Sequence, residues 1–243
     1  MGDRLGAEDI DGMNWFWYAS PQTFDPLAGR MAPWFALAAA LLAAAGLYVG
    51  FFVAPTDAQQ GEVYRIIFIH VPAAWLSMFI YLVMAFWAAL GLAFNTRLSG
   101  MMASALAPTG ALFTFIALWT GSLWGRPTWG TYWVWDARLT SELVLLFLYL
   151  GFIALQAAID DPRRADRAGA LLAIVGAVNI PIIHYSVVWW NTLHQGASVS
   201  VTRGASMQSQ MLIAMLLMAL GFWMYSIAVT LVRVRCIMRE REA

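Results

Sequence analysis

Six stretches of the sequence are long and apolar enough to cross a membrane, and this feature limits the fold more than any other. About 20 residues of helix span about 30 Å of hydrocarbon. Lipid offers no hydrogen-bond partners to an open backbone, so each stretch must be helical. The sequence therefore predicts an all-α integral membrane protein, a six-transmembrane-helix bundle that forms one membrane domain over residues 1–243. The expected spans are residues 33–54, 66–94, 101–124, 139–159, 168–190 and 211–232.

The composition excludes several other classes of protein. Hydrophobic residues make up 61% of the chain and charged residues 12%, whereas about a quarter of the residues in a soluble domain are charged. A water-soluble globular domain and a disordered chain are therefore excluded. The formal net charge of zero argues against a nucleic-acid partner. A single cysteine, Cys236, cannot form an internal disulfide, an iron–sulfur site or a covalent haem attachment.

The arginines predict how the bundle is oriented. If the N-terminus lies inside, ten arginines fall on the inner side and four on the outer side, which agrees with the excess of basic residues in cytoplasmic loops. Both termini are then cytoplasmic, and the outward loops are residues 55–65, 125–138 and 191–207. No cleavable signal peptide is expected, because the first 30 residues hold five acidic residues and no continuous apolar core. The four outer arginines are Arg65, Arg126, Arg138 and Arg203.

The outward loop 125–138 belongs to a stretch that is unusually rich in tryptophan. Residues 119–136 hold five of the thirteen tryptophans, and Trp189 and Trp190 end the fifth span on the same side. One interpretation is an aromatic belt at the membrane interface, but a belt populates both interfaces. The other is a stacking platform for a planar ligand, because exposed indoles suit a flat apolar surface. The one-sided distribution favours the platform.

The chain has three histidines, and two of them lie at matching depth in different spans. His70 and His184 are each six residues from the outer boundary of their span, or about 9 Å below it, and each has a nearby proline, Pro72 or Pro181. Two such histidines suit axial ligation of one iron, although each side chain could instead be a buried packing residue. His194 is interpreted either as a loop residue or as a helper at the rim of the ligand.

Charged residues near the outer face are few. Arg126 and Arg138 are candidates to pair with carboxylates of a ligand, since arginine binds a carboxylate through two hydrogen bonds. The alternative is that both are interfacial arginines that extend toward water. Asp136 closes the tryptophan-rich loop. Thr140 and Glu142 are expected to cap the start of the fourth span.

These residues resemble a known family. The segment WGTYWVWDARLTSEL, residues 129–143, is similar to the tryptophan-rich WWD domain of haem-handling proteins in cytochrome c biogenesis. More narrowly, the chain resembles the haem exporter protein C family of the bacterial cytochrome c maturation system. Residues 64–77, 114–118 and 179–196 support this resemblance, which covers nearly the whole chain. The segment departs from the family at Tyr132, where a tryptophan is expected, but tyrosine keeps an aromatic face.

The resemblance implies a multi-pass protein of the bacterial inner membrane whose active face is periplasmic. Haem b is expected to bind transiently and non-covalently there, with two histidine ligands that match His70 and His184. The protein is expected to pass haem to a periplasmic haem chaperone, the E component. An ATP-binding subunit, a second permease-like subunit and a small single-span subunit are the implied partners in the membrane lipid. The residues expected at the haem site are His70, His184, Trp124, Trp129, Tyr132, Trp133, Trp135, Asp136, Arg126 and Arg138.

Enzyme activity is not expected, and two alternative functions remain. The sequence has no P-loop motif, so ATP hydrolysis is expected in a partner subunit. A membrane b-type cytochrome that carries electrons across the bilayer needs two haems and four ligands, which three outer histidines do not supply. A haem transport permease needs a polar path, yet no charged residue lies at the midplane of the bilayer.

Overall fold

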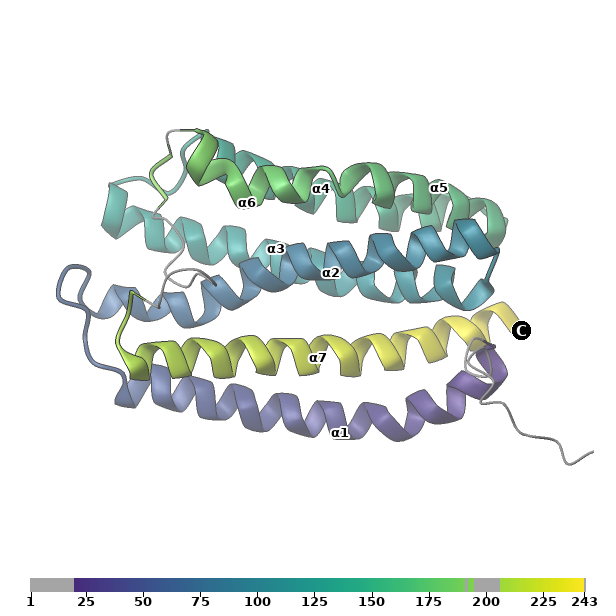
Figure 1. Cartoon of the computed structure of the whole chain (residues 1–243), viewed down its shortest axis with the longest axis horizontal. Helices are drawn as coiled ribbons and strands as arrows, with labels where there is room; N and C mark the ends of the chain where they lie inside the picture. Colours follow the sequence, from purple (N-terminus) through teal and green to yellow (C-terminus); the bar gives the residue numbers. More distant parts are fainter. Residues whose placement is uncertain (1–19, 191, 195–205, 243) are drawn as a thin grey trace, which may run out of the picture.

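The computed structural model describes residues 20–190, 192–194 and 206–242, and the regular elements among them are helices (Figure 1). A π-helical segment, η2, continues the first helix, and a 3₁₀-helical segment, η3, leads into the second. The elements are α1 (Pro21–Tyr48), η2 (Val49–Val53), η3 (Glu62–Ile66), α2 (Ile67–Phe94), α3 (Arg97–Trp129), α4 (Ala137–Ala158), α5 (Pro162–Gly176), α6 (Asn179–Trp189) and α7 (Ser209–Glu242).

These elements form six helical runs that are long and apolar enough to span a membrane, with η2 counted with α1, η3 with α2 and α6 with α5, which confirms the predicted fold class. The helices run beyond the apolar windows of the sequence. For example, α3 is 33 residues long, which corresponds to about 50 Å of helix. It continues through Trp129, so the first part of the expected loop 125–138 is helical. The remaining non-helical part is the segment 130–136.

The helices lie side by side in one bundle, with α1 and α7 along one edge and α4, α5 and α6 along the other (Figure 1). The start of α1 and the end of α7 are at the same end of the bundle, as an even number of spans requires. An ion pair joins these two helices there, with Arg235 Nε 2.8 Å from Asp25 Oδ1. The main core lies among α2, α3, α4 and α5 around the fully buried rings of Tyr81, Tyr149 and Phe152.

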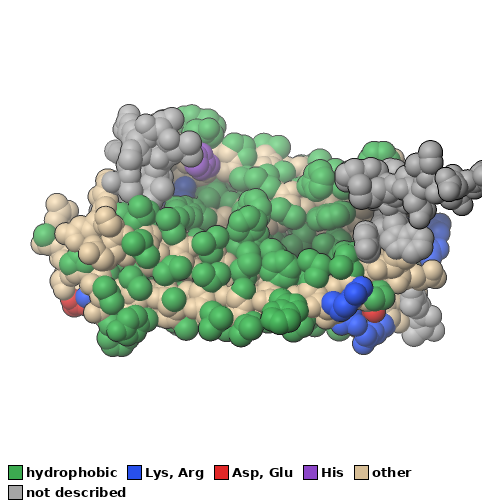
Figure 2. Space-filling model, turned by 60° about the horizontal axis from the view of Figure 1, so that its bottom comes forward, with side chains coloured by type: hydrophobic (Ala, Val, Ile, Leu, Met, Phe, Trp, Pro, Cys, Tyr) green, Lys and Arg blue, Asp and Glu red, His purple; other side chains and the backbone are tan. Residues whose placement is uncertain are grey.

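Hydrophobic side chains also cover the outside of the bundle, as expected for a surface that faces lipid. Figure 2 shows them in a broad band along the length of the molecule, with arginines gathered at the end where the termini lie. On α1, the side chains of Trp34 and Leu41 are 73% and 63% exposed. Water would penalise such a surface, whereas lipid does not.

An arginine joins the first two spans at the end opposite the termini. The π-helical turn closes with a hydrogen bond of 2.7 Å from Ala54 N to Val49 O. Carbonyl groups at the end of a helix lack partners within the helix. Arg65 Nη1 supplies them by donating to Gly50 O at 2.6 Å and to Ala54 O at 3.0 Å. The start of α2 is thereby held against the end of the first span.

The fifth span is broken into α5 and α6, where the sequence predicted one span over 168–190. Pro181 has no N–H to donate to the carbonyl of Ala177, so the helix cannot continue regularly. Ile180 N bonds that carbonyl instead, at 3.1 Å. Asn179 Nδ2 then donates to Ser141 O in α4 at 2.9 Å. The direction of α6 is therefore set by its contact with α4 as well as by α5.

Candidate functional site

A pocket opens at the tryptophan-rich end of the bundle, which we define as the end formed by the last turns of α3, the segment 130–136 and the end of α6. The pocket and its mouth enclose about 410 Å³. Side chains from α2, α3 and α4 form its walls, together with one residue that follows α6. We call it the histidine pocket. Its lining residues are His70, Ala74, Ala117, Leu118, Gly121, Trp129, Arg138, Leu139, Glu142 and His194.

His70 is positioned by α3 in a way that defines which ring nitrogen is available. Its Nδ1 lies 3.0 Å from the hydroxyl oxygen of Thr120. That hydroxyl donates to Ile116 O at 2.6 Å, so it accepts the proton of Nδ1. The Nε2 atom is then unprotonated and able to bind a metal. A methyl group on Gly121 would lie 2.9 Å from His70 Cε1, so this glycine leaves room for the imidazole. The Trp124 ring meets it edge-on, with centroids 5.6 Å apart.

His194 closes the same pocket from the segment after α6. Its ring packs against Trp129, with centroids 4.9 Å apart and planes at 64°. Its Nδ1 lies 3.6 Å from Asp136 Oδ2, and both atoms are buried without a hydrogen-bond partner among the described residues. The other carboxylate oxygen of Asp136 caps α4 by accepting from Leu139 N at 2.8 Å. Burial lowers the pKa of His194, which favours the neutral imidazole that metals bind.

His184 lies elsewhere. It is exposed on α6, where its ring meets that of Tyr185 at a centroid distance of 4.8 Å, and it does not line the histidine pocket. The structure therefore brings His70 together with His194 and does not bring it together with His184. Depth along a span gives the height of a side chain but not the direction in which it points.

The tryptophan-rich segment divides into packed and exposed rings. Trp124 donates its Nε1 proton to Gln60 Oε1 at 2.6 Å, so it fixes the loop before α2. Trp133 is half-buried, and its Nε1 has no hydrogen-bond partner within the part of the chain that the structure describes. Its ring meets that of Trp135 at 5.4 Å, and Trp135 itself is 77% exposed. Tyr132 is 56% exposed. Exposed and packed rings thus lie side by side at the mouth of the bundle.

The two candidate arginines differ in position. Arg138 lines the histidine pocket and donates to Ile183 O in α6 at 2.7 Å, so it joins α4 to α6. Arg126 is exposed, donates to Gly130 O and lies 5.6 Å from the centre of the Tyr132 ring. It does not line the pocket. Only Arg138 is thus placed to meet a ligand inside the pocket.

The structure corrects one expectation about α4. Asp136 caps the start of this helix, and Glu142 does not, because Glu142 lies in the second turn and is buried. Its carboxylate accepts a hydrogen bond of 2.8 Å from Ser77 of α2 and lines the histidine pocket. Neither Ser77 nor Thr120 was singled out in the sequence, because a contact between distant spans leaves no local pattern. Their partners, Glu142 and His70, were noted in the sequence because ionisable residues are few there.

Among the described residues, no group of three or more His, Cys, Asp or Glu side chains is placed to hold a metal ion. Two neutral imidazoles in one pocket are a different arrangement, since they suit an iron that a macrocycle already holds through its own four nitrogens. The two imidazoles, with Nδ1 of His70 held by Thr120 and Nδ1 of His194 beside Asp136, fit together with the surrounding rings a flat, apolar, metal-containing ligand.

Comparison with known proteins identifies the family. The model of the family described as heme exporter protein C matches residues 14–243. A heme exporter protein C of Bradyrhizobium diazoefficiens is 53% identical over 218 residues, which cover 89% of this chain and 82% of the relative. That of Escherichia coli K12 is 51% identical over 217 residues, which cover 89% and 87%. A putative cytochrome c biosynthesis ccmC-like mitochondrial protein of Marchantia polymorpha is 47% identical over 75% of this chain and 77% of the relative. The chain therefore belongs to the heme exporter protein C family, a family named for haem handling.

Proposed function

We propose that this membrane protein binds haem b non-covalently at its tryptophan-rich end and passes it to a periplasmic haem chaperone for the assembly of c-type cytochromes. The observation that carries the proposal is the histidine pocket, in which His70 and His194 come from different parts of the chain and face one space. The family supports a haem-handling role. The site acts by binding and transfer, not by catalysis.

In this proposal, the two axial ligands of the iron are His70 and His194. The hydrogen bond from His70 Nδ1 to Thr120 directs Nε2 toward the iron. Asp136 plays the same part for His194, because its carboxylate lies 3.6 Å from Nδ1 and attracts the proton there. Such outer partners fix the tautomer and the direction of a histidine ligand. The pairing of His70 with His184, expected from the sequence, is the competing assignment.

The surroundings of the two histidines suit the rest of the ligand. Arg138 supplies a cation inside the pocket for a propionate group, since its guanidinium group retains donors beyond the one used on Ile183. Trp129 offers an aromatic face beside His194. The exposed rings of Tyr132 and Trp135 lie outside the pocket, where we place the contact with the chaperone. Their side of the membrane is the periplasm, as the distribution of arginines favours.

We further propose that the protein works in the bacterial inner membrane within a larger complex. Its partners there are an ATP-binding subunit that hydrolyses ATP, a second permease-like subunit and a small single-span subunit. The hydrophobic band on the outside of the bundle supplies surface for both lipid and helices of other subunits (Figure 2). The chain itself contributes the haem site.

The test is the absorption spectrum of the purified protein loaded with haem. Wild-type protein and the control variant His184→Ala are expected to show a six-coordinate, low-spin spectrum. His70→Ala and His194→Ala should each lose that form and regain it with external imidazole, which fills the vacated position. If His184→Ala loses the low-spin spectrum and His194→Ala keeps it, the competing pair is correct. If none of the three changes the spectrum, the histidine pocket does not bind the iron.

A further inference from the structure

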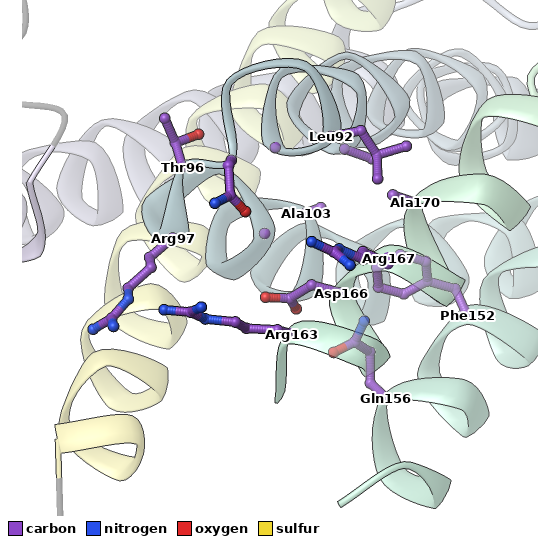
Figure 3. Close-up of a pocket in the computed structure, with 14 residues that line it drawn as sticks. Leu92, Thr96, Arg97, Ala103, Phe152, Gln156, Arg163, Asp166, Arg167 and Ala170 are labelled. Carbon is purple, nitrogen blue, oxygen red and sulfur yellow. The ribbon is translucent and has the colours of Figure 1, made fainter. Parts of the chain in front are cut away.

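A second, larger cavity lies at the opposite end of the bundle, where α1 begins and α7 ends. The cavity, together with the open space at its mouth, amounts to about 790 Å³ between the ends of α2, α3, α4 and α5 (Figure 3). This end is the cytoplasmic one if the arginine distribution sets the orientation. The cavity shares no lining residue with the histidine pocket. We call it the arginine cavity.

Three arginines give the cavity its charge. Arg97, Arg163 and Arg167 line it, and all three are exposed. Figure 3 shows their guanidinium groups gathered on the same side of the cavity as Asp166. The Asp166 carboxylate is already paired with Arg241 through two hydrogen bonds of 2.7 and 2.9 Å. Within the described part of the chain, the three lining arginines have no acidic partner. The mouth of the cavity therefore carries uncompensated positive charge.

The floor of the cavity is apolar. It is formed by the small side chains of Ala88, Ala103 and Ala170 and by the ring of Phe152, all of which are buried within the bundle. Ala88 is six residues before the end of α2, so the floor lies about 9 Å inside the end of the helix. At the rim, Leu92 is 38% exposed. The cavity thus joins a cationic mouth to an apolar interior at the level of the membrane interface.

We propose that the arginine cavity binds the phosphate group of an anionic phospholipid, with the glycerol and the first acyl carbons against the alanine-lined floor. Guanidinium groups bind phosphate oxygens through paired hydrogen bonds. Basic pockets between membrane helices on the cytoplasmic side take anionic headgroups. Inorganic phosphate offers the same charge, but the apolar floor and the exposed Leu92 complement only a ligand with carbon chains. This site is independent of the proposed haem function.

The test uses the full-length protein, purified and stripped of lipid in a neutral detergent. Its thermal unfolding is followed by tryptophan fluorescence with phosphatidylglycerol, phosphatidylcholine or inorganic phosphate added. Phosphatidylglycerol at saturation is expected to raise the Tm by about 5 °C or more, and phosphatidylcholine by much less. Inorganic phosphate should give a small shift at best. An equal shift with inorganic phosphate alone would support the phosphate site but overturn the lipid as its source.

Charge-removing variants locate the site. Arg97→Gln, Arg163→Gln and Arg167→Gln should each weaken phosphatidylglycerol binding on the order of fivefold. Arg164→Gln is the matched control. Arg164 is exposed on α5, as Arg163 and Arg167 are, and it carries the same charge but does not line the cavity. Circular dichroism and size-exclusion chromatography confirm that each variant is folded. Equal loss in the control, or no preference for the anionic lipid in wild-type protein, overturns the proposal. The proposal is also overturned if the three arginine variants lose binding to another subunit while their binding of phosphatidylglycerol is unchanged.

Discussion

The imidazole of His194 lies 4.9 Å from the ring of Trp129, the last residue of α3, although 65 residues separate them along the chain. This contact brings the segment after α6 back onto the end of α3. It places His194 in the lining of the same histidine pocket as His70. A haem placed between the two histidines would therefore have Trp129 as its immediate neighbour.

Thr120 is predicted to act through His70. Thr120→Val keeps the shape of the side chain but removes the oxygen that accepts the Nδ1 proton. Haem affinity, measured by titration of the absorption spectrum, is expected to fall about 10- to 100-fold, as for other outer partners of histidine ligands. Thr120→Ser keeps the hydroxyl and should retain affinity close to that of the wild type. Equal affinity in the valine variant would show that Thr120 does not orient His70.

Gly121 is predicted to tolerate no side chain. In Gly121→Ala the added methyl group would lie 2.9 Å from His70 Cε1, so the imidazole must shift. Haem content after purification is expected to drop, and the spectrum to lose part of its low-spin form. Gly151→Ala is the control, because its methyl group would lie at an ordinary 3.4 Å from Leu172. The same haem content in both variants would contradict the prediction.

Stability of the haem-free protein is predicted to depend on His194 at mildly acidic pH. Its pKa is lowered from the usual 6.5, first by burial and then by the charge of Arg138, with Asp136 acting in the opposite direction. As the pH falls below 6.5, the unfolded chain takes up a proton that folded His194 does not, so the free energy of unfolding declines. Above pH 6.5 His194 is neutral in both the folded and the unfolded chain, so this loss of stability is absent there. Between pH 6.5 and 5 the Tm of wild-type protein should therefore fall more steeply with decreasing pH than the Tm of His194→Gln. Parallel plots of Tm against pH would exclude a role for His194.

At the tryptophan-rich end, loss of an exposed ring is predicted to affect haem transfer, and loss of a packed ring is predicted to affect stability. Trp135→Ala removes a ring that is 77% exposed, so stability should change by about 0.5 kcal/mol or less. Its haem transfer to the chaperone, measured by mixing the two purified proteins, should fall. Trp124→Ala removes a ring that packs on His70 and bonds Gln60, so it should cost about 3 kcal/mol. Trp34→Ala on the lipid-facing side of α1 is the control for both and should leave transfer intact.

The fold was predictable because the bilayer leaves few solutions. An apolar window long enough to span lipid must be helical, and alternating spans then place both ends of α1 and α7 as the structure has them. The site was predictable only in part. His70 and Trp129, which both line the histidine pocket, stood out in the sequence because histidines are few and tryptophans gather in one stretch. That His194 and not His184 lines the pocket with His70 depends on the direction in which each side chain points and on contacts across spans. The depth of a residue along its span predicts neither the direction of its side chain nor its contacts with other spans.

The position of the short helix α6 bears on the width of the histidine pocket, because α6 is bonded to α4, which lines the pocket. Between α5 and α6 the regular helical hydrogen bonds are interrupted, because Pro181 has no N–H to donate to Ala177 O. The position of α6 is shared with α4, through Asn179 on Ser141 and Arg138 on Ile183. The capping residue Asp136, which faces His194, stands at the start of that same α4. The segment 130–136 and the segment that carries His194 are therefore joined to a single helix. Because His70 lies on α2, the width of the pocket depends on the contacts that hold α4 to α2, among them the hydrogen bond from Ser77 to Glu142.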